Sequence, residues 1–175
     1  MAINDHYTDR SRFTRECFGK AVAELMQEME FDKIRVSHIA KRAGFSRMTF
    51  YQYYQSKEDV LIDYLHEIVA AYIRESEVHI NGQFRDEAHV LQAILFFDRY
   101  ADYFRCLVKA GMYGVIIDAV NHYMEEQVIN RHPDQTYVLY AYAGALLNVF
   151  LKWEENGKTV PAQVLARALA LKKDD

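Results

Sequence analysis

The sequence predicts an all-α protein, and three observations support this fold class. Only two prolines and seven glycines occur among the 175 residues, so few positions interrupt a helix. Apolar residues recur at spacings of three and four along most of the chain, and no stretch shows the strict alternation of a half-buried strand. With 51% hydrophobic residues the chain can bury a core, which excludes a disordered protein.

The first helix is expected from Asp9 to Glu30, with an apolar face that includes Phe18 and Leu25. Gly19 is unexpected inside it, because glycine costs up to ~1 kcal/mol against alanine within a helix. A short helix is expected over 36–43.

Gly44 then stands where a helix end favours a left-handed residue, which glycine adopts without a Cβ clash. Ser46 is placed to cap the next helix, expected over 47–54. That helix is too short to be stable alone, so packing through Phe50 and Tyr54 must hold it.

Ser56 is expected to cap a fourth helix that continues to about His79, where Asn81-Gly82 ends it. Five more helices are expected, near 85–98, 102–109, 113–130, 135–156 and 161–171. We therefore predict a helix-turn-helix domain at 1–57, a connecting helix at 58–81 and a C-terminal domain at 82–175.

The net charge of −4 hides an asymmetry along the chain. Residues 1–57 hold ten Lys/Arg against seven Asp/Glu, whereas residues 58–175 hold eleven against eighteen. Within the first part, residues 33–57 carry six Lys/Arg and no acid. Because an acidic body repels a polyanion, a nucleic-acid surface is expected only in the first third.

Other classes of function find little support in the sequence. No apolar run approaches the ~20 residues that span a bilayer and the N-terminus lacks an apolar signal segment, so a soluble, cytoplasmic protein is expected. Cys17 and Cys106 lie far apart, and His122 and His132 lack partners at metal-ligand spacing, so we expect no disulfide, metal or cofactor. No nucleophile–base pair, paired-carboxylate motif or glycine-rich phosphate loop indicates an enzyme.

A family resemblance appears in the run Val36–Tyr54, followed by Ser56–Leu61. The pattern Ile-Ala-(x)2-Ala-Gly-x-Ser-(x)2-Thr-Phe-Tyr, running into Ser-Lys-Glu, resembles the DNA-binding signature of the TetR family of transcriptional regulators. The resemblance implies a three-helix DNA-binding head, a connecting fourth helix, and a C-terminal helical body that dimerises and often binds a small effector.

The resemblance and the side-chain chemistry assign roles within the head. Side chains early on the recognition helix and on its exposed side are expected to read base edges in the major groove, and these are Arg47, Met48, Thr49 and Gln52. Hydroxyls and cations around them are expected to contact phosphates without reading sequence, and these are Ser46, Tyr51, Tyr53 and Lys57. Lys41 and Arg42 are adjacent, so only one of them should approach the DNA backbone.

Arg35 departs from the family pattern, which often has Thr or Ser as a helix cap at this position. A guanidinium only donates hydrogen bonds and cannot cap through an acceptor. Either Ser37 takes over the cap, or the helix is poorly capped and Arg35 contacts a phosphate by charge.

The C-terminal body suggests two further sites. The helix expected at 135–156 is apolar on more than one stripe and, with the last helix, predicts a two-fold four-helix dimer interface; its alternative is a helix buried within one subunit. The interface residues are Tyr140, Ala141, Gly144, Leu147, Asn148, Leu151, Leu165 and Ala168. An apolar effector pocket is expected around Phe97, Tyr100, Phe104, Tyr113 and Tyr123, although the same residues could equally form the core.

Three functions follow, in order of preference. The first is a homodimeric repressor that leaves a palindromic operator in double-stranded DNA when a small apolar effector shifts its conformation. The second is a protein-interaction factor or coactivator that uses a TetR-like fold without binding a ligand. The third is an enzyme, for which no motif is present.

Overall fold

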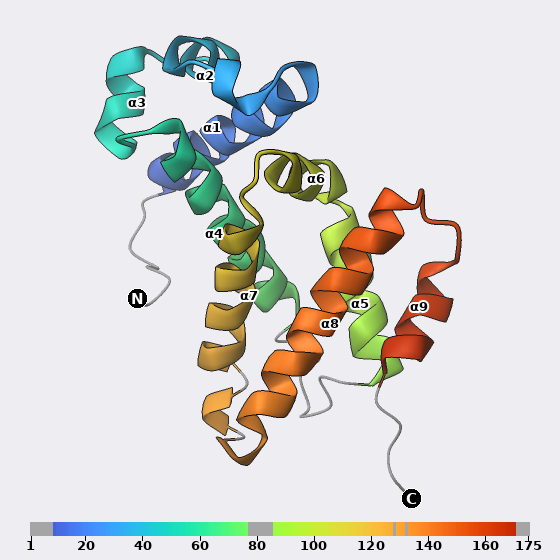
Figure 1. Ribbon diagram of the computed structural model, residues 1–175. Helices are drawn as coiled ribbons and strands as arrows, with labels where there is room; N and C mark the ends of the chain where they lie inside the picture. The colour runs from blue at the N-terminus through green and yellow to red at the C-terminus, as the bar shows by residue number, and fades with distance from the viewer. Residues whose placement is uncertain (1–8, 77–85, 128, 132, 171–175) are drawn as a thin grey trace, which may run out of the picture. The chain divides into compact units, whose positions relative to one another are not determined.

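The computed structural model describes residues 9–76, 86–127, 129–131 and 133–170, and all regular structure within these ranges is helical (Figure 1). The all-α prediction is confirmed. The described residues fall into two compact units: residues up to Ala70 with 106–116, and residues 71–105 with those from Ile117 onward. The domain division predicted at residues 57 and 81 stays a prediction.

The first unit contains four helices and a 3-10 turn: α1 (Asp9–Glu28), η1 (Phe31–Lys33), α2 (Val36–Ala43), α3 (Arg47–Tyr53) and the greater part of α4 (Lys57–Ser76). Its core is aromatic. The ring of Phe18 on α1 lies 5.5 Å from that of Phe50 and 5.8 Å from that of Tyr54, in edge-on contact with both. Because Phe50 is fully buried, this contact holds the short helix α3 in place, as its length requires.

Gly19 has its reason in the packing of α1 on α4. A Cβ atom at this position would lie only 2.3 Å from the ring of Tyr64, a ring that the helix α4 holds against α1. Only glycine permits this approach, and its cost in helix propensity is therefore offset by packing between the two helices.

The second unit contains the end of α4, then α5 (Glu87–Asp98), η2 (Ile129–Arg131), η3 (Pro133–Gln135), α8 (Thr136–Glu155) and α9 (Ala162–Leu169). Helices α6 (Ala101–Lys109) and α7 (Tyr113–Gln127) contribute residues to both units. The helix α9 packs on α5 (Figure 1). On α8, Leu139 and Ala143 are buried against Met124 of α7 and Ile129.

Most predicted boundaries agree with the observed helices to within three residues. The predicted helix over 113–130 ends at Gln127 and is followed by η2, and the last helix begins at Ala162, after Pro161. The predicted end of the fourth helix near His79 and the Asn81-Gly82 boundary lie outside the described residues. Within the described ranges no helix has the length and apolarity to cross a bilayer.

Candidate nucleic-acid interface

A glycine turn joins α2 to α3. Gly44 adopts φ +78°, and the N–H of Phe45 donates to the carbonyl of Ala40 at 2.9 Å, which closes the end of α2. Ser46 then caps α3, because its Oγ accepts the N–H of Thr49 at 3.0 Å. The predicted turn and cap are confirmed, and together they set the direction in which α3 leaves α2.

The outward face of α3 carries the predicted base-reading residues. Arg47, Met48 and Gln52 are exposed, and 77% of Met48 is open to solvent. Thr49 is half-buried, with its hydroxyl 2.9 Å from that of Ser46, so its methyl group is the part left for an apolar contact. The structure thus brings all four side chains to one short helix whose opposite side is anchored by Phe50.

The two tyrosines assigned to phosphate contacts differ in environment. Tyr51 is 54% exposed. Tyr53 is half-buried, and the guanidinium of Arg15 lies 5.5 Å from the centre of its ring. Tyr51 is therefore the more accessible donor of the two.

Lys57 has partners within the head. Its ammonium donates to the carbonyl of Phe31 at 2.6 Å and to that of Ile34 at 3.2 Å, and it lies 4.3 Å from the centre of the Phe31 ring. Two of its three protons are thus used to hold the segment between α1 and α2. The expected phosphate contact must be made with the third proton.

Arg35 occupies the position before α2, and its side chain makes no capping hydrogen bond. His38 provides part of a cap instead, since its Nδ1 accepts the backbone N–H of Arg35 at 3.3 Å. The alternative in which Ser37 caps the helix is wrong, because α2 already begins at Val36. The exposed guanidinium of Arg35 remains open to a phosphate.

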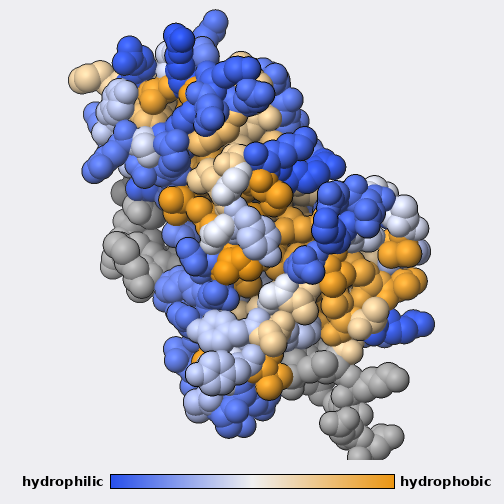
Figure 2. Space-filling view, viewed as in Figure 1, coloured by the Kyte–Doolittle hydropathy of each residue, from blue (hydrophilic) through white to orange (hydrophobic). Residues whose placement is uncertain are grey.

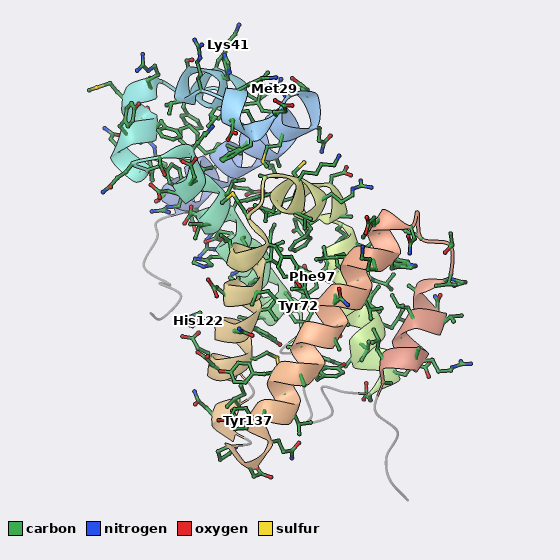
Figure 3. The ribbon with its side chains drawn as sticks, in the orientation of Figure 1. Met29, Lys41, Tyr72, Phe97, His122 and Tyr137 are labelled. Carbon is green, nitrogen blue, oxygen red and sulfur yellow. The ribbon has the colours of Figure 1, made fainter. Side chains whose placement is uncertain are left out.

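Lys41 and Arg42 differ in their ion pairs with the acidic residues of α1. The guanidinium of Arg42 pairs with Glu28 at 2.7 Å and with Glu24 at 3.2 Å, and its hydrogen bond holds the pKa of Glu28 below the ordinary value. Lys41 is exposed on the outer side of α2 (Figure 3), with no ion pair among the described residues. Of the two, Lys41 is therefore the cation available to DNA.

Sequence reasoning missed one network beside this surface. Asp63 on α4 accepts a hydrogen bond from Arg15 of α1 at 2.7 Å and another from the Tyr54 hydroxyl, also at 2.7 Å. No local pattern pairs residues 48 positions apart, so no signal in the sequence could have found it.

Four of the five predicted effector-pocket residues, Phe97, Tyr100, Phe104 and Tyr123, lie in the second unit. Phe97 contacts Tyr72 with ring centres 5.0 Å apart (Figure 3), and Phe104 contacts Phe150 at 5.9 Å. Tyr113 begins α7, belongs to the first unit and is 39% exposed. The aromatic cluster is packed ring on ring, as the alternative core interpretation expects.

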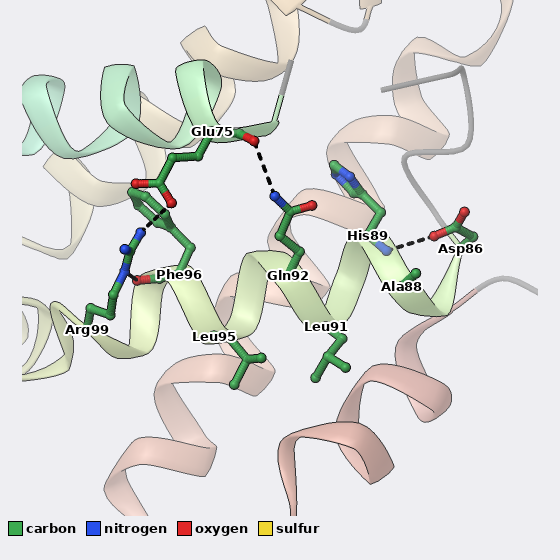
Figure 4. A pocket seen from close by; sticks show the side chains of 9 residues that line it. All are labelled: Glu75, Asp86, Ala88, His89, Leu91, Gln92, Leu95, Phe96 and Arg99. Atoms are coloured by element: carbon green, nitrogen blue, oxygen red, sulfur yellow. Dashed lines mark hydrogen bonds and ion pairs between the residues drawn. The ribbon is translucent and has the colours of Figure 1, made fainter. Parts of the chain in front are cut away.

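An open groove of about 650 Å³ lies instead along α5 (Figure 4). It is lined by Glu75, Asp86, Ala88, His89, Leu91, Gln92, Leu95, Phe96 and Arg99, and includes none of the five predicted residues. Arg99 pairs with Glu75 at 2.8 Å and lies 4.2 Å from the centre of the Phe96 ring. Burial lowers the pKa of His89, whose Nε2 lies 3.1 Å from the Tyr72 hydroxyl.

The residues of the predicted dimer interface differ in their exposure to solvent. Ala141, Asn148 and Ala168 are exposed, and Tyr140, Gly144, Leu151 and Leu165 are half-buried. Leu147 is buried within the chain and is not free to form an interface, because it points to the inner side of α8. A Cβ atom at Gly144 would meet nothing within 4 Å, so packing within the chain does not require glycine there. Apolar surface gathers over α8 and α9 in Figure 2.

These elements define a helix-turn-helix protein with an exposed recognition helix. Residues 20–64 match the model of the bacterial regulatory proteins of the tetR family, so the chain carries the N-terminal domain of this family and the resemblance seen in the sequence is confirmed. The match includes α2, the turn and α3, and it ends within α4.

Known relatives agree with this assignment. Over 52 residues the chain is 38% identical to the HTH-type dhaKLM operon transcriptional activator DhaS of Lactococcus lactis subsp. lactis (strain IL1403); the alignment covers 30% of this chain and 28% of that protein. Among solved structures, Lin0861 from Listeria innocua superposes with a TM-score of 0.79 over 97% of this chain and 92% of that one, at 14% identity. The dihydroxyacetone kinase operon activator DhaS superposes with a TM-score of 0.66 over 91% and 93%, at 17% identity. The two superpositions extend the similarity in fold to the C-terminal helices.

Proposed function

We propose that this protein is a homodimeric, cytoplasmic regulator of transcription that binds a palindromic operator in double-stranded DNA. The observation that carries the proposal is the outward face of α3, where Arg47, Met48 and Gln52 are exposed on a helix whose inner side is anchored by Phe50. Side chains of these types match the donors, acceptors and methyl groups of base edges in the major groove. Arg35, Ser46, Tyr51, Tyr53 and Lys57 are the proposed phosphate contacts.

Dimerisation follows from the size of this reading surface. One helix of seven residues contacts only a few base pairs, whereas two copies about one DNA turn apart, ~34 Å, read a palindrome. The exposed side of α8, with Ala141, Gly144 and Asn148, supports a face on which a second copy packs.

We further propose repression relieved by a small effector as the mode of regulation. The second candidate is activation, which the role of the Lactococcus relative as a transcriptional activator favours. The groove along α5, beside Arg99, is where we propose that an effector binds in the second unit.

Selection from a randomised pool of DNA duplexes tests the proposal. The wild-type protein is expected to enrich a palindromic sequence, and the logarithm of its affinity should fall linearly with the logarithm of salt concentration. Sedimentation at the same protein concentrations should give twice the chain mass. If no duplex is enriched and binding does not depend on salt, the proposed function is wrong.

A further inference from the structure

The recognition helix ends in a hydrogen-bonded network that links three helices. Tyr54 follows α3 directly, and its hydroxyl donates to Asp63 Oδ2 at 2.7 Å. Arg15 of α1 donates to the other oxygen, Asp63 Oδ1, at 2.7 Å. One carboxylate on α4 therefore holds both the end of α3 and the middle of α1.

The network is shielded from water. Tyr54 is 5% exposed, and the side chains of Arg15 and Asp63 are 14% and 21% exposed. Charge-assisted hydrogen bonds between partly buried groups are stronger and more directional than those at the surface. The planar guanidinium also lies over the rings of Tyr53 and Tyr54, at 5.5 and 5.7 Å from their centres, which adds a second contact with the end of α3.

We infer that Asp63 is a positioning residue for operator recognition: through Tyr54 and Arg15 it fixes the orientation of α3, although it touches no DNA itself. The inference rests on the proposed DNA binding. A helix of seven residues does not hold its own orientation. The Ser46 cap fixes its start and Phe50 fixes its inner side, whereas Tyr54 and its hydrogen bond to Asp63 fix its C-terminal end. The base-reading side chains are thereby held before DNA arrives.

Electrostatics and positioning make opposite predictions for Asp63→Asn. Removing a negative charge from the head favours a polyanion and should tighten binding if Asp63 acts through charge. If Asp63 positions α3, the same substitution should weaken binding to the selected palindromic duplex about tenfold, because Arg15 loses its charged partner. Glu58→Gln, which removes an exposed charge from the first turn of α4, is the matched control and should not weaken binding.

Tyr54→Phe provides a second test that keeps the ring and the net charge. It removes only the hydroxyl bonded to Asp63, and is expected to weaken binding to the selected duplex about threefold. Binding to an unrelated duplex depends on charge more than on the orientation of α3, so Tyr54→Phe should leave it unchanged and Asp63→Asn should not weaken it. The ratio of the affinity for the selected duplex to that for the unrelated duplex separates the two roles. If the network only stabilises the fold, this ratio should be the same in the variants and the wild type, measured below their unfolding temperatures.

The outcomes are separable. If the wild type selects a duplex and both variants prefer that duplex over an unrelated one by the same ratio as the wild type does, the positioning role is wrong and the proposed function stands. If the wild type selects no duplex at all, the proposed function fails and this inference fails with it. Should Asp63→Asn not fold, Tyr54→Phe decides alone.

Discussion

Lys57 donates a hydrogen bond to the carbonyl oxygen of Phe31 at 2.6 Å and also lies over the ring of the same residue. The lysine begins α4, whereas the phenylalanine lies in η1, between α1 and α2. Lys57, which the sequence predicts to contact DNA, thus also holds the segment between α1 and α2 in place.

Lys57→Ala is therefore expected to have two effects. It should lower the free energy of unfolding by about 2 kcal/mol, since two carbonyls lose a charged donor. It should also lower the salt slope of DNA binding by about one, if the third proton reaches a phosphate. Urea unfolding and salt titrations measure the two effects, and Lys41→Ala, on the exposed side of α2, should change the slope alone. An unchanged slope for Lys57→Ala would remove this residue from the phosphate contacts.

Gln52→Ala should relax the preference at one base-pair position and leave the salt slope unchanged. Gln52 is exposed on α3 and carries an amide that can pair with adenine but no charge that displaces counterions. Repeating the duplex selection with the variant measures this directly. A uniform loss of affinity for all sequences would contradict a base-reading role.

Gly19→Ala should destabilise the first unit by about 2 kcal/mol, because overpacking against the ring of Tyr64 exceeds the gain in helix propensity. Gly144→Ala is the matched control, also within a helix but with nothing within 4 Å of the added Cβ, and should be neutral or stabilising in the monomer. Thermal unfolding of both variants makes the comparison. Equal effects would mean that the α1–α4 approach tolerates a methyl group.

Ala141→Glu should shift the protein from dimer to monomer at micromolar concentration. The exposed side of α8 is the proposed contact with a second copy, where two symmetry-related charges would face each other without compensation. Val108→Glu adds the same charge at an exposed apolar residue outside the predicted interface and should leave the mass unchanged. Sedimentation equilibrium distinguishes them, and a dimeric Ala141→Glu would place the interface elsewhere.

The stability of the second unit should depend on pH through Glu154. Its side chain is 1% exposed and lies with Asp98 and Lys158, and the Lys158 ammonium is 3.2 Å from its Oε1. Burial, followed by the hydrogen bond with Asp98, raises the pKa of Glu154. Burial alone would also raise the pKa of Asp98, but hydrogen bonds from Lys158 and Glu154 lower it. We therefore expect Glu154 to keep its proton to a higher pH than Asp98 does.

The sign of the effect follows from this arrangement. A raised pKa in the folded state contributes stability that is complete below the ordinary glutamate pKa, about 4.3, and is lost as the pH rises through the raised value. Glu154→Gln cannot ionise, so its stability relative to the wild type should increase as the pH rises from about 4.3 through the raised pKa, and should stay constant above it. Urea unfolding between pH 4 and 8 measures the difference, with the exposed Glu155→Gln as control. Parallel curves for the wild type and Glu154→Gln would contradict the proton assignment.

Local features of the head could be predicted from the sequence because their causes are local. The helix 36–43, the positive φ of Gly44 and the cap by Ser46 all depend on residues within four positions of one another. Features that depend on distant residues could not. The need for glycine at position 19 comes from Tyr64, and the role of Asp63 comes from Arg15, which is 48 positions away.

In the C-terminal body, too, features that depend on distant residues could not be predicted. Aromatic residues between 94 and 124 indicated either a pocket or a core, and periodicity alone does not separate a ring that lines a cavity from one that packs on another ring. The groove along α5 combines polar residues such as Glu75 and Arg99 with apolar residues such as Leu95, and it joins the end of α4 to α5, so no single periodic pattern in the sequence marks it. The apolar stripes of the helix at 135–156 likewise do not show which apolar residues face outward, and Leu147 is buried within the chain.

Under the proposed DNA binding, the pairing of Arg42 with Glu24 and Glu28 affects how the protein finds its operator. A guanidinium already neutralised by two carboxylates displaces fewer counterions from DNA, so it adds little to adhesion on arbitrary sequence. A head with lower non-specific affinity dissociates faster from sequences other than its operator. A larger share of its affinity for the operator must then come from contacts with the bases.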